Sequence, residues 1–222
     1  GLHLVLRSDL APAAMDTFLE IFRDRAHALL PGFETDVVGT VVDLGANEGY
    51  YTLRMKLLNP TVRVVAAEPV SENAELFRAN LVANKVKNVG IRETAVTNRN
   101  GTVVLETLPH VGSVASTDIL AFPRPWIRSD MIERREVPTT TLANLLEESG
   151  IEEAEILKID VEGSEIPILS EAQSELRRFR RIVVECHGSE TRRRVRELAE
   201  SEGFDCLHAV AKRSGDLYFH RR

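Results

Sequence analysis

The sequence is poor in several features that would define whole classes of protein. Its two cysteines, Cys186 and Cys206, are too few for a disulfide framework, and neither belongs to a C-x-x-C or Cys/His cluster of the kind that binds structural zinc. This cysteine usage is typical of a reducing compartment, so we expect a cytoplasmic protein. No internal repeat or low-complexity tract divides the 222 residues, which predicts one domain with a substantial core.

Two further absences concern membranes and nucleic acids. No uninterrupted apolar run approaches the roughly 20 residues that a membrane span requires, and the N-terminus lacks a basic-then-apolar signal pattern. Acidic residues outnumber basic ones by 34 to 28, and the formal net charge of −6 disfavours non-specific binding to nucleic acid. We therefore expect neither a membrane span nor a nucleic-acid partner.

What the sequence does contain is a glycine-rich turn between an apolar strand and a helix, in residues 41–52 (VVDLGANEGYYT). Gly45 and Gly49 allow a sharp turn and a close approach of a ligand to the main chain, while Asp43 and Asn47 supply polar groups beside it. The pattern D-x-G-x-N-x-G lacks the middle glycine of the G-x-G-x-x-G loop that cradles a pyrophosphate. It favours a cofactor with a neutral or cationic centre, such as S-adenosylmethionine; an ordinary strand-to-helix turn is the alternative for this motif alone.

A second strand, predicted over residues 62–67, ends at Glu68 and Pro69. Glu68 follows Asp43 by about one βαβ unit, which is the distance that brings a carboxylate beside the ribose of a bound adenosine. The two carboxylate oxygens can accept hydrogen bonds from both ribose hydroxyls, although the same geometry would serve a nicotinamide cofactor. After a third strand, predicted over residues 89–94, Ala95 could flank the adenine ring or simply pack in the core.

A third informative block, residues 156–165 (ILKIDVEGSE), is again a buried strand that ends in carboxylates. Ligands collect at the carboxyl ends of strands in an open parallel sheet, so Asp160 is expected to face the reacting centre. It could orient an acceptor hydroxyl, hold the ammonium group of the cofactor or, with Glu162, help to bind a hard divalent ion. One carboxylate pair does not predict a metal site, and we assign no metal ligand.

The next strand, predicted over residues 182–188, ends with Glu185 and His187, which fall on the same face by the two-residue alternation of a strand. An imidazole can take a proton from an acceptor hydroxyl near neutral pH, so His187 is a candidate general base and Glu185 a candidate for orienting it. A hydrogen-bonded structural histidine is the alternative.

The other segments frame these motifs. Residues 107–135 read as a long irregular loop, which we assign to acceptor recognition. Asn80 and Asn84, one turn apart on a helix, are expected at the surface. The remaining predicted elements are a strand over residues 2–6, a helix from Pro12 to Leu29, a hairpin turn at Asn100–Gly101 with a returning strand over residues 102–106, strands over residues 137–141, 203–208 and 216–220, and helices over residues 50–58, 142–148 and 191–202.

Taken in order, the motifs at 41–52, 68–69 (EP), 157–165 (LKIDVEGSE) and 183–187 (VVECH) resemble the FkbM family of S-adenosylmethionine-dependent methyltransferases. The resemblance implies a class I, Rossmann-like α/β fold: a seven-stranded mixed sheet in the order 3-2-1-4-5-7-6, with helices on both faces and an antiparallel last strand pair. A single methyltransferase domain would then span residues 1–222, with an N-terminal cap over residues 1–35, a core over residues 36–222 and a variable loop over residues 107–135.

The resemblance also implies roles for individual residues. Asp43, Gly45, Asn47 and Gly49 would line the amino acid moiety of the cofactor, and Asp160 would lie at the methyl-transfer region. Glu68 would bind the ribose. Further cofactor contacts are assigned to Ala46, Tyr50, Pro69 and Ala95.

The expected reaction is O-methylation of a small-molecule hydroxyl, on a sugar or a natural-product-type acceptor. The acceptor oxygen would attack the methyl group in line, so the protein would contribute positioning, exclusion of water and removal of a proton. Two alternatives are an NAD(P)-dependent Rossmann oxidoreductase, which should carry the glycine pattern missing here, and a non-catalytic protein that only binds an adenosyl cofactor.

Overall fold

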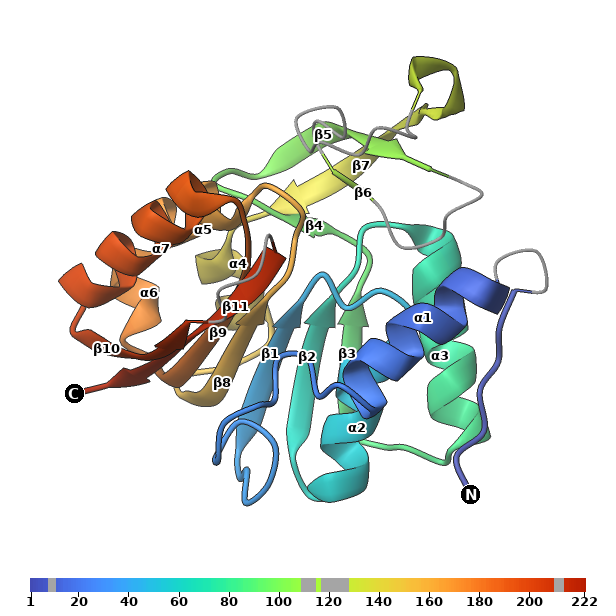
Figure 1. Cartoon of the computed structure of the whole chain (residues 1–222), viewed down its shortest axis with the longest axis horizontal. Helices are drawn as coiled ribbons and strands as arrows, with labels where there is room; N and C mark the ends of the chain where they lie inside the picture. The colour runs from blue at the N-terminus through green and yellow to red at the C-terminus, as the bar shows by residue number, and fades with distance from the viewer. Residues whose placement is uncertain (8–10, 109–114, 117–127, 210–213) are drawn as a thin grey trace.

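A seven-stranded sheet forms the centre of the molecule, with the strand order β10-β11-β9-β8-β1-β2-β3 (Figure 1). The computed structural model describes residues 1–7, 11–108, 115–116, 128–209 and 214–222. The strands of this sheet are β1 (Thr40–Leu44), β2 (Arg63–Ala67), β3 (Val89–Arg92), β8 (Ala154–Ile159), β9 (Phe179–His187), β10 (Phe204–Ala209) and β11 (Ser214–Arg221).

The pairing of these strands confirms the expected class I order and the antiparallel end of the sheet. β1 lies between β2 and β8 and is parallel to both, and β3 and β9 continue the parallel array on either side. β11 is antiparallel to its two neighbours, β9 and β10. The strand order therefore reverses at β1, because β2 and β8 lie on opposite sides of it. The carboxyl ends of β1, β2, β8 and β9 meet at one edge of the sheet, where ligands bind in such folds.

Helices cover both faces of the sheet, as expected. Alternation along β1 sends Val41 into one apolar cluster with Phe77, and sends Val42 and Leu44 into a second cluster with Leu142. The first face carries α1 (Ala11–Phe22), α2 (Tyr50–Leu58) and α3 (Ser71–Ala83), and the second carries α4 (Leu142–Glu148), α5 (Glu165–Glu171), α6 (Gln173–Leu176) and α7 (Ser189–Ser201).

Within the described ranges, no helix combines the length and the apolar character that a membrane span would need.

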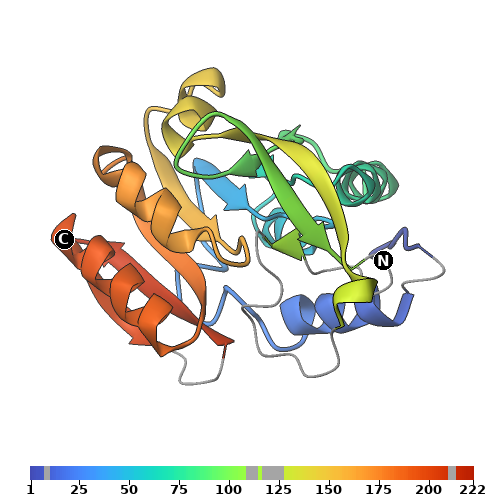
Figure 2. The same ribbon diagram turned by 90° about the horizontal axis from the view of Figure 1, so that it is seen from above.

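A second, four-stranded sheet lies across the edge that the carboxyl ends of the parallel strands form (Figures 1 and 2). Its order is β4-β7-β5-β6, where β4 is Ala95–Val96, β5 is Gly101–Thr107, β6 is Ala115–Ser116 and β7 is Glu133–Thr140. No pattern in the sequence predicts this second sheet.

The second sheet corrects two predictions. The expected hairpin at Asn100–Gly101 is wrong, because β7 is inserted between β4 and β5 and pairs with both of them. This long-range pairing buries Ala95, Leu105 and Val137 together, which a local hairpin would not achieve. The predicted loop 107–135 is also too long: β7 begins at Glu133 and pairs it with Thr107, while most of the intervening residues lie outside the described ranges.

The N-terminal region departs from prediction in three places. Residues 2–6 form no strand; instead, the backbone N–H groups of His3 and Val5 donate to the side chains of Asn84 and Asn80. Asn80 is accordingly buried rather than at the surface. The helix predicted to reach Leu29 ends at Phe22, because the chain turns through residues with positive φ, among them His27 at 61°.

Candidate cofactor and methyl-transfer site

The two glycines of the first motif are required by contacts inside the protein. Gly45 has a φ of +73°, and a Cβ atom there would stand 1.7 Å from the carbonyl oxygen of Asp160. Gly49 has a φ of +82°, and its Cβ would stand 2.0 Å from the ring of Phe77. Gly45 therefore allows the loop after β1 to touch the tip of β8, and Gly49 allows the start of α2 to pack on α3.

Asp43 lies fully buried beneath this loop and pairs with Lys158 of β8, its direct neighbour in the register of the sheet. One carboxylate oxygen accepts a 2.8 Å hydrogen bond from Thr52, and the other lies 3.1 Å from Lys158 Nζ. Lys158 also donates to the carbonyl oxygen of Gly45 at 2.8 Å. Burial alone would lower the pKa of Lys158, but Asp43 and Asp160 outweigh it and raise this pKa, so the lysine stays charged.

Glu68 follows β2 and forms a corner of the site with neutral hydrogen-bond donors only. Its carboxylate accepts from the backbone N–H groups of Asn47 (2.8 Å) and Val70 (2.9 Å) and from the Asn73 side chain (3.3 Å). Burial raises the pKa of Glu68 to about 7 despite these donors. The side-chain oxygen of Asn47 beside it is buried and has no hydrogen-bond partner within the described part of the chain.

Three other predicted cofactor contacts are buried in the protein's own core. Ala46 and Tyr50 belong to the apolar cluster on the α2 face, and the Tyr50 hydroxyl donates to the buried carboxylate of Glu48. Ala95 packs with Leu105 and Val137 in the second sheet. Pro69, the fourth, is half-buried directly after Glu68.

Asp160 begins a cluster of carboxylates and imidazoles at the ends of β8 and β9. Its carboxylate lies 3.4 Å from Lys158 Nζ and 3.5 Å from His27 Nε2. Burial would raise the pKa of Asp160, but Lys158 and His27 hold it well below its usual value, so this carboxylate is ionised at neutral pH. Asp160 is thus a fixed negative charge at the expected reacting centre.

The structure also brings Glu185 and His187 together. Glu185 Oε1 lies 3.7 Å from His187 Nε2, and Glu185 Oε2 lies 3.9 Å from His27 Nε2, so one carboxylate is shared by two imidazoles. His187 Nε2 is also 3.5 Å from a carboxylate oxygen of Glu162. The base and the orienting residue predicted from the sequence therefore lie within one charged cluster.

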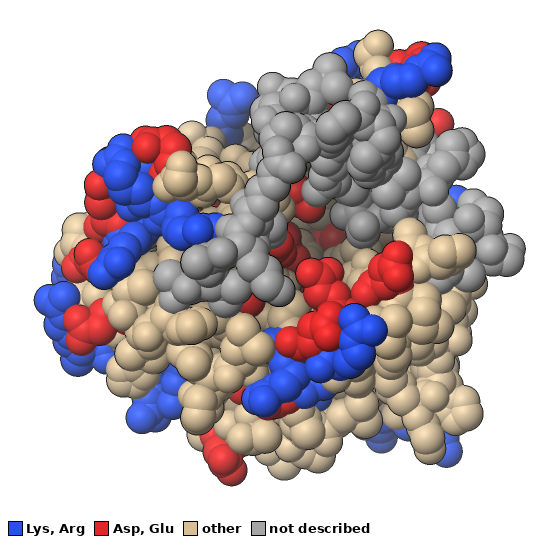
Figure 3. Space-filling model, in the orientation of Figure 1, with Lys and Arg blue, Asp and Glu red and all other residues tan. Residues whose placement is uncertain are grey.

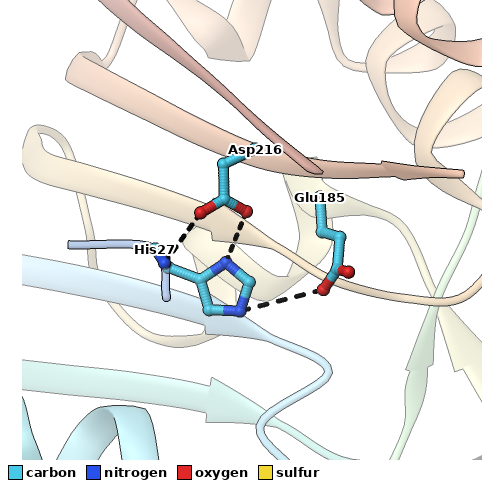
Figure 4. Close-up of side chains that lie close together, drawn as sticks. All are labelled: His27, Glu185 and Asp216. Carbon is cyan, nitrogen blue, oxygen red and sulfur yellow. Dashed lines mark hydrogen bonds and ion pairs between the residues drawn. The ribbon is translucent and has the colours of Figure 1, made fainter. Parts of the chain in front are cut away.

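His27 and Asp216 complete this cluster and were not identified from the sequence (Figure 4). Asp216, on β11, accepts from the backbone N–H of His27 and lies 2.8 Å from its Nδ1 atom. Burial would lower the pKa of His27, but Asp216 and Asp160 hold it well above the ordinary value. No sequence motif marks either residue, since they lie 189 positions apart and His27 belongs to an irregular segment.

These residues fit a cationic adenosyl cofactor. The Glu68 carboxylate and the free acceptor oxygen of Asn47 suit ribose hydroxyls, and the tips of β8 and β9 carry more carboxylates than cations. Figure 3 shows acidic side chains gathered around a hollow in this face of the molecule. A sulfonium and an ammonium group would offset that excess of negative charge.

The fold and this arrangement of groups define a class I methyltransferase. The chain superposes on fibrillarin from Aeropyrum pernix, solved with bound S-adenosyl-L-methionine, with a TM-score of 0.51 and 12% identity over 86% of this chain and 68% of that one. A model of the Methyltransferase FkbM domain matches residues 43–206, and the protein belongs to this FkbM methyltransferase family. Its cofactor is S-adenosylmethionine.

Two curated relatives cover most of the chain. The 31-O-demethyl-FK506 methyltransferase FkbM of Streptomyces tacrolimicus is 29% identical over 80% of this chain and 76% of its own length. Methyltransferase sdnD of Sordaria araneosa is 24% identical over 80% of this chain and 78% of its own length.

Proposed function

We propose that the protein transfers the methyl group of S-adenosylmethionine to a hydroxyl oxygen of a small molecule, a sugar or a natural-product-type acceptor. The observation that carries this proposal is the charged cluster at the tips of β8 and β9. In it, Glu185 lies within 4 Å of both His187 and His27, and His27 lies 3.5 Å from Asp160. The name of the Streptomyces relative, which acts on a 31-O-demethyl compound, supports oxygen as the methylated atom.

His187 is the proposed general base. Its side chain keeps some exposure, at 15%, whereas that of His27 is 5% exposed, so an acceptor hydroxyl can reach His187 more directly. Glu162 and Glu185 lie within 4 Å of its Nε2 atom and would stabilise the imidazolium formed when it takes the hydroxyl proton. The bound cofactor supplies an electrophilic methyl group, which the deprotonated oxygen can attack.

The other residues would position the two substrates. Glu68 and the side-chain oxygen of Asn47 would accept hydrogen bonds from the ribose hydroxyls, and the Asp160 carboxylate would lie near the positive charge at the methyl group. Asp43 would act indirectly, because its contacts with Thr52 and Lys158 hold the loop after β1 against β8. Ala46, Tyr50 and Ala95 would act only through the packing of the core, and Gly45 and Gly49 through the close contacts of the loop with Asp160 and Phe77. Pro69 would fix the chain directly after Glu68.

The test has two stages. Isothermal titration should show binding of S-adenosylmethionine and S-adenosylhomocysteine and no comparable binding of NAD, and Glu68→Ala should weaken both. Incubation with methyl-labelled cofactor and a panel of hydroxylated sugars and polyketides should then give a product whose NMR spectrum carries a new O-methyl signal.

The general base is tested by His187→Asn with His208→Asn as its matched control, since His208 is exposed on β10. We expect the first variant to lower the transfer rate by about 100-fold, and the second to keep it. A methyl group on nitrogen or carbon would overturn the proposal, as would tight binding of NAD. Cofactor binding without transfer to any acceptor would favour a non-catalytic binding protein.

A further inference from the structure

The two ring nitrogens of His27 have different surroundings (Figure 4). Nδ1 lies 2.8 Å from Asp216 Oδ1, an ordinary hydrogen-bond distance. Nε2 points between two carboxylates and is 3.5 Å from Asp160 Oδ2 and 3.9 Å from Glu185 Oε2. These separations exceed the range of about 2.7–3.2 Å in which N–H groups bond to oxygen. The His27 side chain is only 5% exposed, so Nε2 faces protein groups that stand too far away to hydrogen bond well.

Such separations match those between two ligands of one metal ion. Nitrogen and oxygen ligands stand about 2.0–2.2 Å from zinc, so neighbouring ligand atoms lie about 3–4 Å apart. Within the described ranges, His27, Glu185 and Asp216 can each bring one ligand atom to within 4.8 Å of the others. Asp160 is not part of that group, but its Oδ2 atom approaches the same ring nitrogen, Nε2, as Glu185 Oε2 does.

Asp216 supports the imidazole and is not itself available as a ligand. Its two oxygens are occupied by the Nδ1 and backbone N–H of His27 and by the Tyr218 hydroxyl, each at 2.8 Å. Metal-binding histidines almost always bond their second ring nitrogen to a carboxylate, a backbone carbonyl or water, and Asp216 has this role here. A bound metal ion would take the place of the proton that Nε2 carries in the charged imidazole. The backbone bond from His27 to Asp216 fixes the residue at a φ of 61° and so fixes the direction of the ring.

We propose that His27 Nε2, Asp160 and Glu185 bind one divalent transition-metal ion, such as Mn²⁺ or Zn²⁺. The mixed imidazole and carboxylate donors suit these ions better than Mg²⁺ or Ca²⁺, which prefer sites of oxygen alone. Lys158 Nζ lies 3.1 Å from Asp43 and 3.4 Å from Asp160 Oδ2, so it neutralises part of the negative charge of the proposed ligands.

The sequence predicts no metal ligand, because its motifs bring together only the carboxylates at 160 and 162. The ligand that changes this conclusion, His27, comes from the N-terminal segment, and the residue that orients it, Asp216, comes from the last strand. The role of the ion rests on the proposed function: at this position it would bind the acceptor hydroxyl and lower its pKa beside His187. Metal binding itself does not depend on that reaction.

The test uses the full-length protein after dialysis against a chelator. Mn²⁺ is titrated in, and the loss of the electron paramagnetic resonance signal of the free ion reports binding; Zn²⁺ and Mg²⁺ are then added as competitors. We expect one Mn²⁺ per chain, displaced by Zn²⁺ and poorly by Mg²⁺. Glu185→Gln and His27→Gln should each weaken binding by more than about 10-fold, and Asp216→Asn by about 10-fold or more.

The matched control is Glu152→Gln, an exposed glutamate next to the amino end of β8, at the opposite edge of the sheet. It should bind Mn²⁺ as the parent does. Circular dichroism and S-adenosylhomocysteine binding confirm that each variant is folded. Where a His27 variant fails to fold, Glu185→Gln decides the question alone.

The outcomes separate this site from the proposed function. If the folded parent binds S-adenosylhomocysteine but neither Mn²⁺ nor Zn²⁺, the metal site is overturned and the methyltransferase proposal stands. The protonated imidazole of His27 then forms ion pairs with Asp160 and Glu185 in place of a metal ion. Binding that Glu185→Gln leaves unchanged also overturns it. Metal binding that is lost in the variants, in a protein that methylates no hydroxyl, supports the site and overturns the proposed function instead.

Discussion

Two carboxylates flank β1 at equivalent positions, yet the protein gives them opposite environments. Glu68 follows β2 and Asp160 follows β8, and β2 and β8 are the two parallel neighbours of β1. Glu68 is bonded by neutral amides, and burial raises its pKa to about 7. Asp160 lies within 3.5 Å of both Lys158 and His27, and these cations hold its pKa well below its usual value against the effect of burial.

The difference shows how one sheet topology can give two carboxyl groups different chemical properties. A carboxyl group among neutral donors ionises close to neutral pH and is suited to recognising hydroxyl groups. A carboxyl group that cations keep ionised provides a permanent negative charge, which suits a positively charged methyl donor.

Substitutions around Lys158, which pairs with Asp43 and Asp160, should destabilise the protein more than substitutions around Glu68. In Lys158→Met the buried Asp43 loses its cation, so the free energy of unfolding should fall by about 3–5 kcal/mol. Glu68→Gln, which removes no partner charge, should change it by less than about 1 kcal/mol. Urea denaturation measures both. The double variant Lys158→Met with Asp43→Asn should recover part of the loss, and an equal cost for Lys158→Met and Glu68→Gln would refute the contrast.

Gly45 connects the loop after β1 with the tip of β8, so substitution there should damage the site through the backbone. In Gly45→Ala the new Cβ would meet the carbonyl oxygen of Asp160, and we expect a loss of about 3 kcal/mol in unfolding free energy. Gly39→Ala is the control: its φ is +86°, but no atom lies within 4 Å of the added Cβ, so only the conformational cost of about 1 kcal/mol should appear. Similar losses in both variants would show that the contact with Asp160 is unimportant.

Asp160 and Glu68 should affect different steps, methyl transfer and cofactor binding respectively. Asp160→Asn removes a charge that we propose to lie near the transferring methyl group, and it should lower the rate at saturating cofactor by about 100-fold. Glu68→Gln weakens hydrogen bonds to the ribose and should raise the dissociation constant of S-adenosylhomocysteine by about 10-fold. Single-turnover transfer and calorimetry measure the two effects. A rate loss in Glu68→Gln as large as that in Asp160→Asn would remove the distinction.

The smallest effect is a pH dependence at Glu68. Its folded pKa of about 7 lies above the ordinary 4.5, so its contribution to stability is complete below pH 4.5 and is lost as pH rises through 7. Cofactor binding should show the opposite trend, because in the proposed site the ionised carboxylate of Glu68 accepts from the ribose hydroxyls. The affinity should improve up to about 10-fold from pH 6 to pH 8. Calorimetry across this range checks it, and Glu68→Gln should give a flat profile.

The central sheet and the strand-end motifs were predictable from local patterns. The apolar runs at 41–44 and 156–159 predict buried strands, and carboxylates that follow such runs predict a site where parallel strands end. The sequence also indicates a buried ion pair at Lys158, because a charged residue within a buried apolar run needs a partner of opposite charge. Its pairing with Asp43 follows directly once β1 and β8 are neighbours in register.

The remaining features depend on contacts between distant segments. His27 owes its position to one buried aspartate on the last strand, and no periodicity near residue 27 indicates this. The second sheet pairs β5 with β7 across residues whose sequence suggests only a loop, because β-pairing is decided by which partner buries the apolar face. In the same way, residues 2–6 could not be predicted to bond with asparagine side chains instead of a strand.

The ladder between β5 and β7 has a consequence for how this protein can diversify. Because Thr107 and Glu133 are paired, the chain departs from the body of the enzyme and returns to it at adjacent points. An insertion or deletion between those points adds only a small closure entropy and leaves the strands that hold the methyl donor in place. Because we assign residues 107–135 to acceptor recognition, we propose that specificity for new acceptors can evolve within this one stretch while the central sheet stays unchanged.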